Sequence, residues 1–105
     1  MTSICLVLTT AGSADEGKKI AQALVERRLA SCVNIIPRIE SVYRWKEQVE
    51  SAEEWFLLIK TRKDAFERVR TAIEELHSYE LPECIMLEIA EGDQAYLDWL
   101  AKNTE

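Results

Sequence analysis

The feature that most constrains this chain is a pair of long, strand-like segments in its middle. From residue 32 to residue 46, apolar and polar side chains alternate, and residues 54–61 form a second strand-like segment with five consecutive apolar residues at 55–59. The first strand alone would extend about 50 Å at ~3.3 Å per residue. A domain of 105 residues is only about 35 Å across. The predicted hairpin, with residues 47–53 as its connection, must therefore bend or project beyond its own domain.

A hairpin of this length predicts that copies of the chain assemble. Apolar side chains are expected on both faces of the sheet: Trp55, Leu57 and Ile59 on one face, and Phe56, Leu58, Cys84 and Met86 on the other. The two helices predicted below would cover only one face of this sheet. The other face would then be a bare apolar patch, which is uncommon on a soluble monomer. We therefore expect a homo-oligomer whose interface comes mostly from residues 32–61. Because Pro37 cannot donate a ladder hydrogen bond, we also expect a bulge or bend there.

Five further elements are predicted around the hairpin. They are a buried strand at residues 4–10, a helix whose capping box is Ser13 and Glu16, a second helix capped within residues 61–64, a strand at residues 83–90 and a short helix capped by Asp93. With the hairpin, the order becomes strand, helix, strand, strand, helix, strand and a final helix. This order is typical of the α+β, ferredoxin-like βαββαβ sandwich, with two helices on one face of an antiparallel sheet.

Composition narrows the class of protein. With 48% hydrophobic and 30% charged residues, we expect one globular domain over residues 1–105. No apolar run approaches the ~20 residues of a membrane-spanning helix, and no signal peptide is evident, so no membrane association is expected. The net charge of −6 argues against sequence-independent nucleic-acid binding, which depends on Lys and Arg. Three cysteines without paired spacing favour a reducing, cytoplasmic setting.

Residues 12–19 are similar to a phosphate-binding loop but lack its chemistry. Lys19 occupies the place where Ser or Thr would hold Mg²⁺, and the two acids before the lysines would repel phosphate. Nowhere does the sequence pair a nucleophile with a base and an orienting group. Neighbouring acids such as Glu53 and Glu54 are interpreted as a solvated surface. The sequence therefore predicts a protein without enzymatic activity.

His77, the only histidine, has two interpretations. At the end of the second predicted helix, it can simply interact with the helix dipole. It can also be a metal ligand together with Glu80, Glu83 or a thiolate, a donor set that suits Cu or Zn. One imidazole and scattered thiols cannot close a four-ligand site within one chain by sequence spacing. The symmetry of an oligomer could bring ligands from neighbouring chains together, and weak binding is expected.

Five separated segments carry a family resemblance. They are residues 30–37, 41–45, 58–61, 77–83 and 92–100. Together they resemble the CutA family, the divalent-cation-tolerance proteins, along nearly the whole chain. The resemblance implies a homotrimer of ferredoxin-like subunits, similar in architecture to PII signalling proteins. It also implies an association with tolerance to copper and other divalent metals, and no settled enzymatic activity.

The first function implied by the resemblance is a copper-tolerance protein that binds metal ions weakly. Its candidate ligands are His77, Cys32, Glu80 and Glu83. Copper-binding members of the family can use a Cys and a second His where this chain has Thr9 and Leu76. Of that set, only His77 is present here.

The alternative is a PII-like regulatory module. In this case the clefts between subunits would bind a small molecule or a protein partner. Lys60, Tyr79 and Trp45 are the residues expected to line such a cleft. A metal titration distinguishes the two functions, because only the first predicts a shift in melting temperature.

Overall fold

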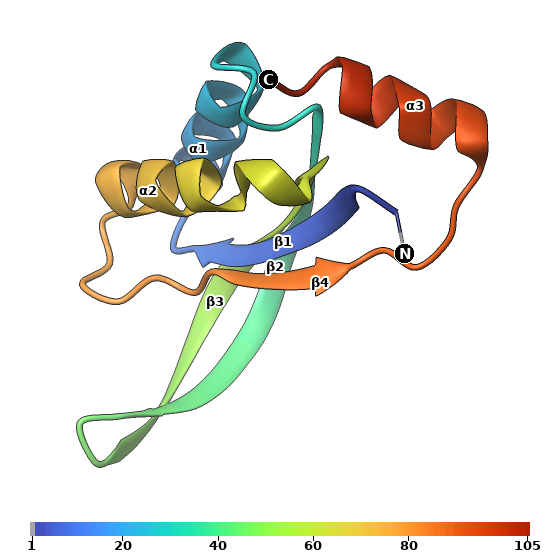
Figure 1. Cartoon of the computed structure of the whole chain (residues 1–105). Helices are drawn as coiled ribbons and strands as arrows, with labels where there is room; N and C mark the ends of the chain where they lie inside the picture. Colours follow the sequence, from blue (N-terminus) through green and yellow to red (C-terminus); the bar gives the residue numbers. More distant parts are fainter. Residues whose placement is uncertain (1) are drawn as a thin grey trace.

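A four-stranded antiparallel sheet with helices packed on it forms the framework of the chain (Figure 1). The elements, in chain order, are β1 (Ile4–Ala11), α1 (Ala14–Glu26), β2 (Cys32–Trp45), β3 (Gln48–Arg62), α2 (Phe66–Leu76), β4 (Ile85–Glu88) and α3 (Gln94–Lys102). The structure is a computed structural model that describes residues 2–105. The strands lie in the order β2-β3-β1-β4. The predicted α+β arrangement with an additional C-terminal helix is confirmed.

One face of the sheet carries the main hydrophobic core. Val7 of β1 lies opposite Ile59 of β3, and both side chains are fully buried. The apolar stripes of α1 and α2 pack against this face, and their fully buried members are Ile20, Leu24, Val69 and Ile73. Complete burial of one such side chain contributes about 1.5–3 kcal/mol. The helical spacing of these residues is why the sequence predicts both helices.

The opposite side of the sheet is also apolar. Its side chains, called the open face from here on, are Leu6, Leu8, Phe56, Leu58, Ile85 and Leu87. The prediction for Met86 and Cys84 is wrong: Met86 lies opposite Val7, so both face the helices. Side chains alternate along a strand, so an offset of one residue reverses every assignment. Among the helices of residues 2–105, only α3 reaches this side, where its buried leucines pack against Ile4 at one end of β1.

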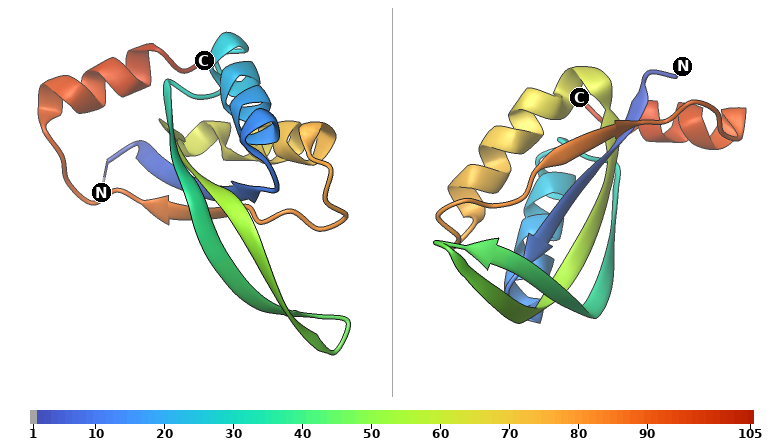
Figure 2. Two further views of the ribbon diagram at one scale, coloured as in Figure 1. Left: turned by 180° about the vertical axis from the view of Figure 1, so that it is seen from behind. Right: turned by 90° about the horizontal axis from the view of Figure 1, so that it is seen from below.

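The β2–β3 hairpin projects from the rest of the molecule (Figure 2). The principal extents of the chain are 44 × 25 × 23 Å, so the long axis exceeds the other two by far. The register shifts between Ile36 and Ile39, which confirms the irregularity predicted at Pro37. Arg38 has a positive φ of 58° at this bulge. The overlong strands therefore both bend and extend beyond their own domain.

The turn of the hairpin is much shorter than predicted. Residues 47–53 do not form its connection, because β3 already begins at Gln48. Only Lys46 and Glu47 make the turn, with positive φ values of 49° and 71°. Two successive left-handed residues are typical of a type I′ turn, which matches the twist of the strands. The acidic residues of this segment are tolerated in β3 because the projecting strand is open to solvent.

The predicted helix caps are partly correct. The side chains of Ser13 and Asp93 each accept a backbone hydrogen bond in the first turn of α1 and α3. The cap expected within residues 61–64 does not form, because one 3₁₀ turn (η1, Lys63–Ala65) leads directly into α2. The fourth strand is shorter than the predicted residues 83–90, because the chain before it turns away from β1 into a loop.

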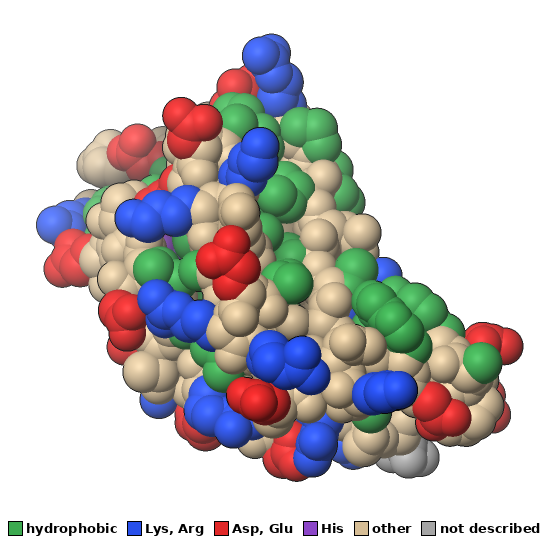
Figure 3. All heavy atoms as spheres, turned by 90° about the horizontal axis from the view of Figure 1, so that it is seen from above, with side chains coloured by type: hydrophobic (Ala, Val, Ile, Leu, Met, Phe, Trp, Pro, Cys, Tyr) green, Lys and Arg blue, Asp and Glu red, His purple; other side chains and the backbone are tan. Residues whose placement is uncertain are grey.

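The surface seen from above mixes charges of both signs with apolar groups (Figure 3). On α3, Tyr96 and Trp99 stack with ring centroids 5.8 Å apart, and both are exposed. None of the helices within residues 2–105 combines the length and the apolar character that a bilayer crossing would require.

Candidate functional site

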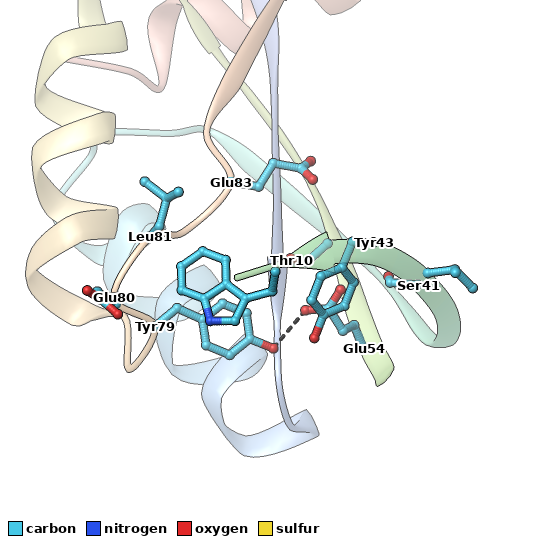
Figure 4. Close-up of a pocket in the computed structure, with 10 residues that line it drawn as sticks. Thr10, Ser41, Tyr43, Glu54, Tyr79, Glu80, Leu81 and Glu83 are labelled. Atoms are coloured by element: carbon cyan, nitrogen blue, oxygen red, sulfur yellow. Dashed lines mark hydrogen bonds between the residues drawn. The ribbon is translucent and has the colours of Figure 1, made fainter. Parts of the chain in front are cut away.

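A hollow of about 720 Å³ is bounded by the β2–β3 hairpin, the end of β1 and the loop between α2 and β4 (Figure 4). Its lining includes three acids, Glu54, Glu80 and Glu83, and three aromatic residues, Tyr43, Trp45 and Tyr79. None of the described residues that line it is basic. Small-molecule sites in proteins have volumes of about 300–1,000 Å³. The hollow is therefore large enough for a small organic ligand.

Tyr79 and Glu54 connect two walls of the hollow. The Tyr79 hydroxyl donates to Glu54 Oε2 at 2.7 Å, and Figure 4 shows the two side chains directed toward one another from separate segments. Burial, followed by the hydrogen bond to Glu54, raises the pKa of Tyr79 far above its ordinary value. The hydroxyl therefore remains a donor. Gly12 leaves room for this ring, because a Cβ there would lie 3.0 Å from the Tyr79 oxygen.

Glu54 is a buried carboxylate without a counter-charge. The residue is 7% exposed, and within residues 2–105 no basic side chain forms an ion pair with it. Burial, followed by the negative charge of Glu54, raises the pKa of Glu83. Two acids that repel one another beside a hollow without bases make it electronegative. Such a site favours a cation and repels phosphate.

His77 anchors the loop that lines the hollow. Its side chain is fully buried, and Nε2 lies 2.6 Å from the carbonyl oxygen of Thr10. That contact assigns the ring proton to Nε2, which donates, while Nδ1 accepts the Tyr79 backbone N–H at 3.1 Å. Both ring nitrogens of His77 are therefore engaged within the chain. A metal ion could bind this imidazole only after one of the two hydrogen bonds had broken.

Glu16 holds the same loop from the start of α1. Its carboxylate accepts the backbone N–H of Ser78 at 2.8 Å and that of Gly12 at 3.3 Å. Burial alone would raise the pKa of Glu16, but these hydrogen bonds outweigh it and lower the pKa. Glu16, in the first turn of α1, is thus a clamp that positions the loop with Tyr79.

The structure separates the predicted site residues. Trp45, Tyr79, Glu80 and Glu83 line the hollow, His77 anchors its loop, and Lys60 and Cys32 lie elsewhere. Lys60 Nζ lies 3.4 Å from the Tyr96 hydroxyl, on α3. Cys32 packs beside Ile4, and His77 contacts Thr10, so β1 separates the two by about 20 Å. Within residues 2–105, no group of three or more His, Cys, Asp or Glu side chains could hold a metal ion.

Glu54 is the residue of the hollow that the sequence interpretation missed. Its interpretation as a solvated acid is wrong, although its neighbour Glu53 is exposed. Glu54 pairs with Ile39, the first register position after the bulge. The available signal was an acid directly before the apolar run 55–59, where a solvated side chain is hard to place. Its partner Tyr79 lies 25 positions away, and no spacing rule connects the two.

Comparison with known proteins places the chain in a family. The model of the CutA1 divalent ion tolerance protein family matches residues 5–103. This chain belongs to that family. A divalent-cation tolerance protein CutA of Thermus thermophilus is 48% identical over 99 residues, which cover 94% of this chain and 96% of that protein. The chloroplastic protein CutA of Arabidopsis thaliana is 42% identical over 94% of this chain and 54% of its own length.

Solved structures give the same result for the fold. The CutA1 structure from Thermus thermophilus has a TM-score of 0.95 at 46% identity and covers 97% of this CutA chain and 99% of its own. The PII-like protein CutA from Nostoc, in its apo form, has a TM-score of 0.89 at 35% identity. The match covers 96% of this chain and 97% of the Nostoc chain. The chain thus shares the PII-like fold of its relatives.

Proposed function

We propose that this CutA chain is a homotrimeric, PII-like regulatory module that binds a small ligand in the hollow beside its hairpin. The observation that carries this proposal is the hollow itself. It combines a volume of about 720 Å³ with an aromatic lining and a buried acid, Glu54, that forms no ion pair with a basic side chain within residues 2–105. A purely structural cavity has no need of an uncompensated acid, because burying a charge without a partner is costly.

Trimerisation is supported by the apolar surface that one chain leaves uncovered. On the open face, Ile85 and Leu87 are 53% and 50% exposed, and in the hairpin Val42 and Val49 are each 67% exposed. An apolar surface of this kind marks an interaction site. The family resemblance implies three copies. Because the hairpin also lines the hollow, a neighbouring chain packed on it would border the ligand site.

Light scattering on the purified protein tests the assembly. The expected mass is three times the 12.1 kDa of one chain. A stable species of single-chain mass at micromolar concentration would contradict the proposal.

A variant that fills the hollow tests the ligand site. Melting temperatures are measured with a panel of amines, carboxylates, sugars, nucleotides and metal ions, because any ligand of the native state raises the melting temperature. Ser41 lines the hollow, so Ser41→Trp should abolish the shift produced by any true ligand. Ser51→Trp, in the exposed part of β3, is the matched control and should keep it. If no compound shifts the wild type, or if both variants keep the shift, the hollow is not the ligand site.

Weak binding of Cu or Zn is the second candidate function. Glu80 and Glu83 line the hollow together with Glu54, and the family, like the relative from Thermus thermophilus, is named for tolerance to divalent ions. Binding should be no tighter than micromolar, because His77 is already hydrogen bonded and a ligand from Cys32 would have to come from a neighbouring chain. Calorimetric titration with Cu²⁺ and Zn²⁺ tests this. An isotherm unchanged by His77→Ala would remove His77 from the proposed ligand set.

A cytoplasmic location and the absence of catalysis complete the proposal. Cys5, Cys32 and Cys84 are all free, which suits a reducing compartment. Relatives carry other locations in their names: the one from Arabidopsis is chloroplastic, and one from Archaeoglobus fulgidus is periplasmic. Cell fractionation tests the location. An ATP turnover assay tests the proposed absence of catalysis, and turnover that Lys18→Ala abolishes would contradict it.

A further inference from the structure

We propose that the ligand of the hollow is a small organic cation, an amine or quaternary ammonium group attached to an apolar body. This inference rests on the proposed function, because it names the chemical class of the ligand that the hollow takes. Three properties of the hollow lead to it: its charge, its aromatic lining and its size.

The charge of the hollow requires a positive partner. Glu54 as a residue is more than nine-tenths buried, and the Tyr79 hydroxyl that donates a hydrogen bond to its carboxylate carries no charge. Within residues 2–105, neither Glu54 nor Glu83 forms an ion pair with a basic side chain. A cation that enters the hollow supplies the missing counter-charge to both acids. Carboxylates and phosphates are disfavoured for the same reason.

The aromatic residues distinguish an organic cation from a metal ion. Tyr43, Trp45 and Tyr79 all line the hollow. Aromatic faces attract ammonium groups, as the Lys46 ammonium does 5.8 Å from the centroid of the Trp45 ring, and quaternary ammonium ligands are typically bound in cages of such rings. A metal ion instead needs several donor atoms at fixed distances, and the described residues offer no group of three such ligands.

The size and rim of the hollow fit a ligand with an apolar body. A volume of about 720 Å³ is far larger than a bare ion requires. Leu81, which is 73% exposed, lines the hollow together with the rings of Tyr43 and Trp45, and these side chains offer apolar contact. An ammonium group at Glu54 and Glu83 would leave its alkyl or aryl body against these side chains.

Calorimetry with three matched probes tests the inference. The probes are benzyltrimethylammonium, benzyl alcohol and phenylacetate, which share an aryl ring but are positive, neutral and negative. Only the first should bind. Glu54→Gln should weaken its binding roughly tenfold or more, whereas Glu53→Gln, the exposed neighbour with the same change of charge, should leave it unchanged. Glu83→Gln, at an exposed position, is a second test in case Glu54→Gln does not fold, and should also weaken binding.

The outcomes separate this inference from the function on which it rests. Equal binding to Glu54→Gln and Glu53→Gln, or to Glu83→Gln and wild type, would overturn the assigned site. If phenylacetate, benzyl alcohol or Zn²⁺ binds in a manner that Ser41→Trp abolishes, while the ammonium probe does not, the hollow remains a ligand site but the cation class is wrong. If no probe of any class binds, both the inference and the proposed ligand site fail.

Discussion

Two buried threonines show how strongly single residues depend on their hydrogen-bond partners. Thr9 and Thr61 are both fully buried in adjacent strands. The hydroxyl of Thr61 donates to the carbonyl oxygen of Leu29 at 2.7 Å. The hydroxyl of Thr9 is buried and has no hydrogen-bond partner within residues 2–105. The same substitution at these two positions should therefore have opposite effects.

We predict that Thr9→Val raises the free energy of unfolding by about 1 kcal/mol, because an unsatisfied buried hydroxyl is replaced by a methyl group of similar shape. Thr61→Val should lower the free energy of unfolding by about 1 kcal/mol, because the carbonyl oxygen of Leu29 loses its donor. Denaturant unfolding of both variants measures the difference. A loss of stability in Thr9→Val comparable to that in Thr61→Val would contradict the prediction.

The lowered pKa of Glu16 predicts how the free energy of unfolding depends on pH. Its pKa is lower in the folded chain than in the unfolded chain, where it has its ordinary value of about 4.3. The charged clamp therefore contributes stability above that value, and the contribution is lost as the pH falls through the folded pKa. Glu16→Gln should reduce the pH dependence of the free energy of unfolding between about pH 5 and pH 3. Denaturant unfolding across this range is the measurement, and an unchanged slope would show that Glu16 does not act as a charged clamp.

At the scale of elements, the hairpin carries most of what is unusual about this protein. Its turn places Lys46 and Glu47 in left-handed conformations that side chains with a Cβ adopt at a cost. Type I′ turns favour Asn followed by Gly at these positions. The native turn is thus less stable than the same turn with Asn and Gly at these two positions would be.

We predict that the double variant Lys46→Asn, Glu47→Gly raises the free energy of unfolding by about 1 kcal/mol, because it removes the conformational strain of the turn. Glu50→Gly, placed within β3, is the control and should lower stability, since glycine weakens a strand. Thermal melting at one protein concentration compares the variants. A destabilised turn variant would mean that native contacts of these side chains, such as that of Lys46 Nζ 5.8 Å from the centroid of the Trp45 ring, outweigh the strain of the turn.

At the scale of the whole molecule, the open face dominates the expected behaviour. Leu87 is 50% exposed on this face, and Val25 is 42% exposed on α1. Both are apolar and accessible in the single chain, but only Leu87 belongs to the surface proposed to pack against other copies. The same change at the two positions therefore tests which surface assembles.

We predict that Leu87→Lys weakens the trimer and lowers its mass in light scattering at micromolar concentration, whereas Val25→Lys retains the trimer mass. Because assembly completes the burial of the open face, the melting temperature of the wild type should also fall on dilution. A full trimer mass for Leu87→Lys, or a melting temperature independent of concentration, would argue that the open face is not the interface.

The sequence by itself determined the order and type of the elements of this CutA chain, because helical and strand periodicities are local properties. It also determined that the hairpin is too long for its domain, since strand length follows directly from residue count. The sequence also determined that Ser13 and Asp93 are helix caps, because each side chain bonds within the first turn of its own helix.

Only the tertiary structure decided which side chains meet. The register of β4 against β1 placed Met86 on the helix-covered face. The bulge after Ile36 resets the pairing of β2 with β3, and at the next paired position Glu54 is buried beside Tyr79. The fold likewise put His77 and Cys32 at opposite ends of β1. Each of these contacts joins distant segments, and their geometry depends on strand register and chain packing, which no local pattern of residues encodes.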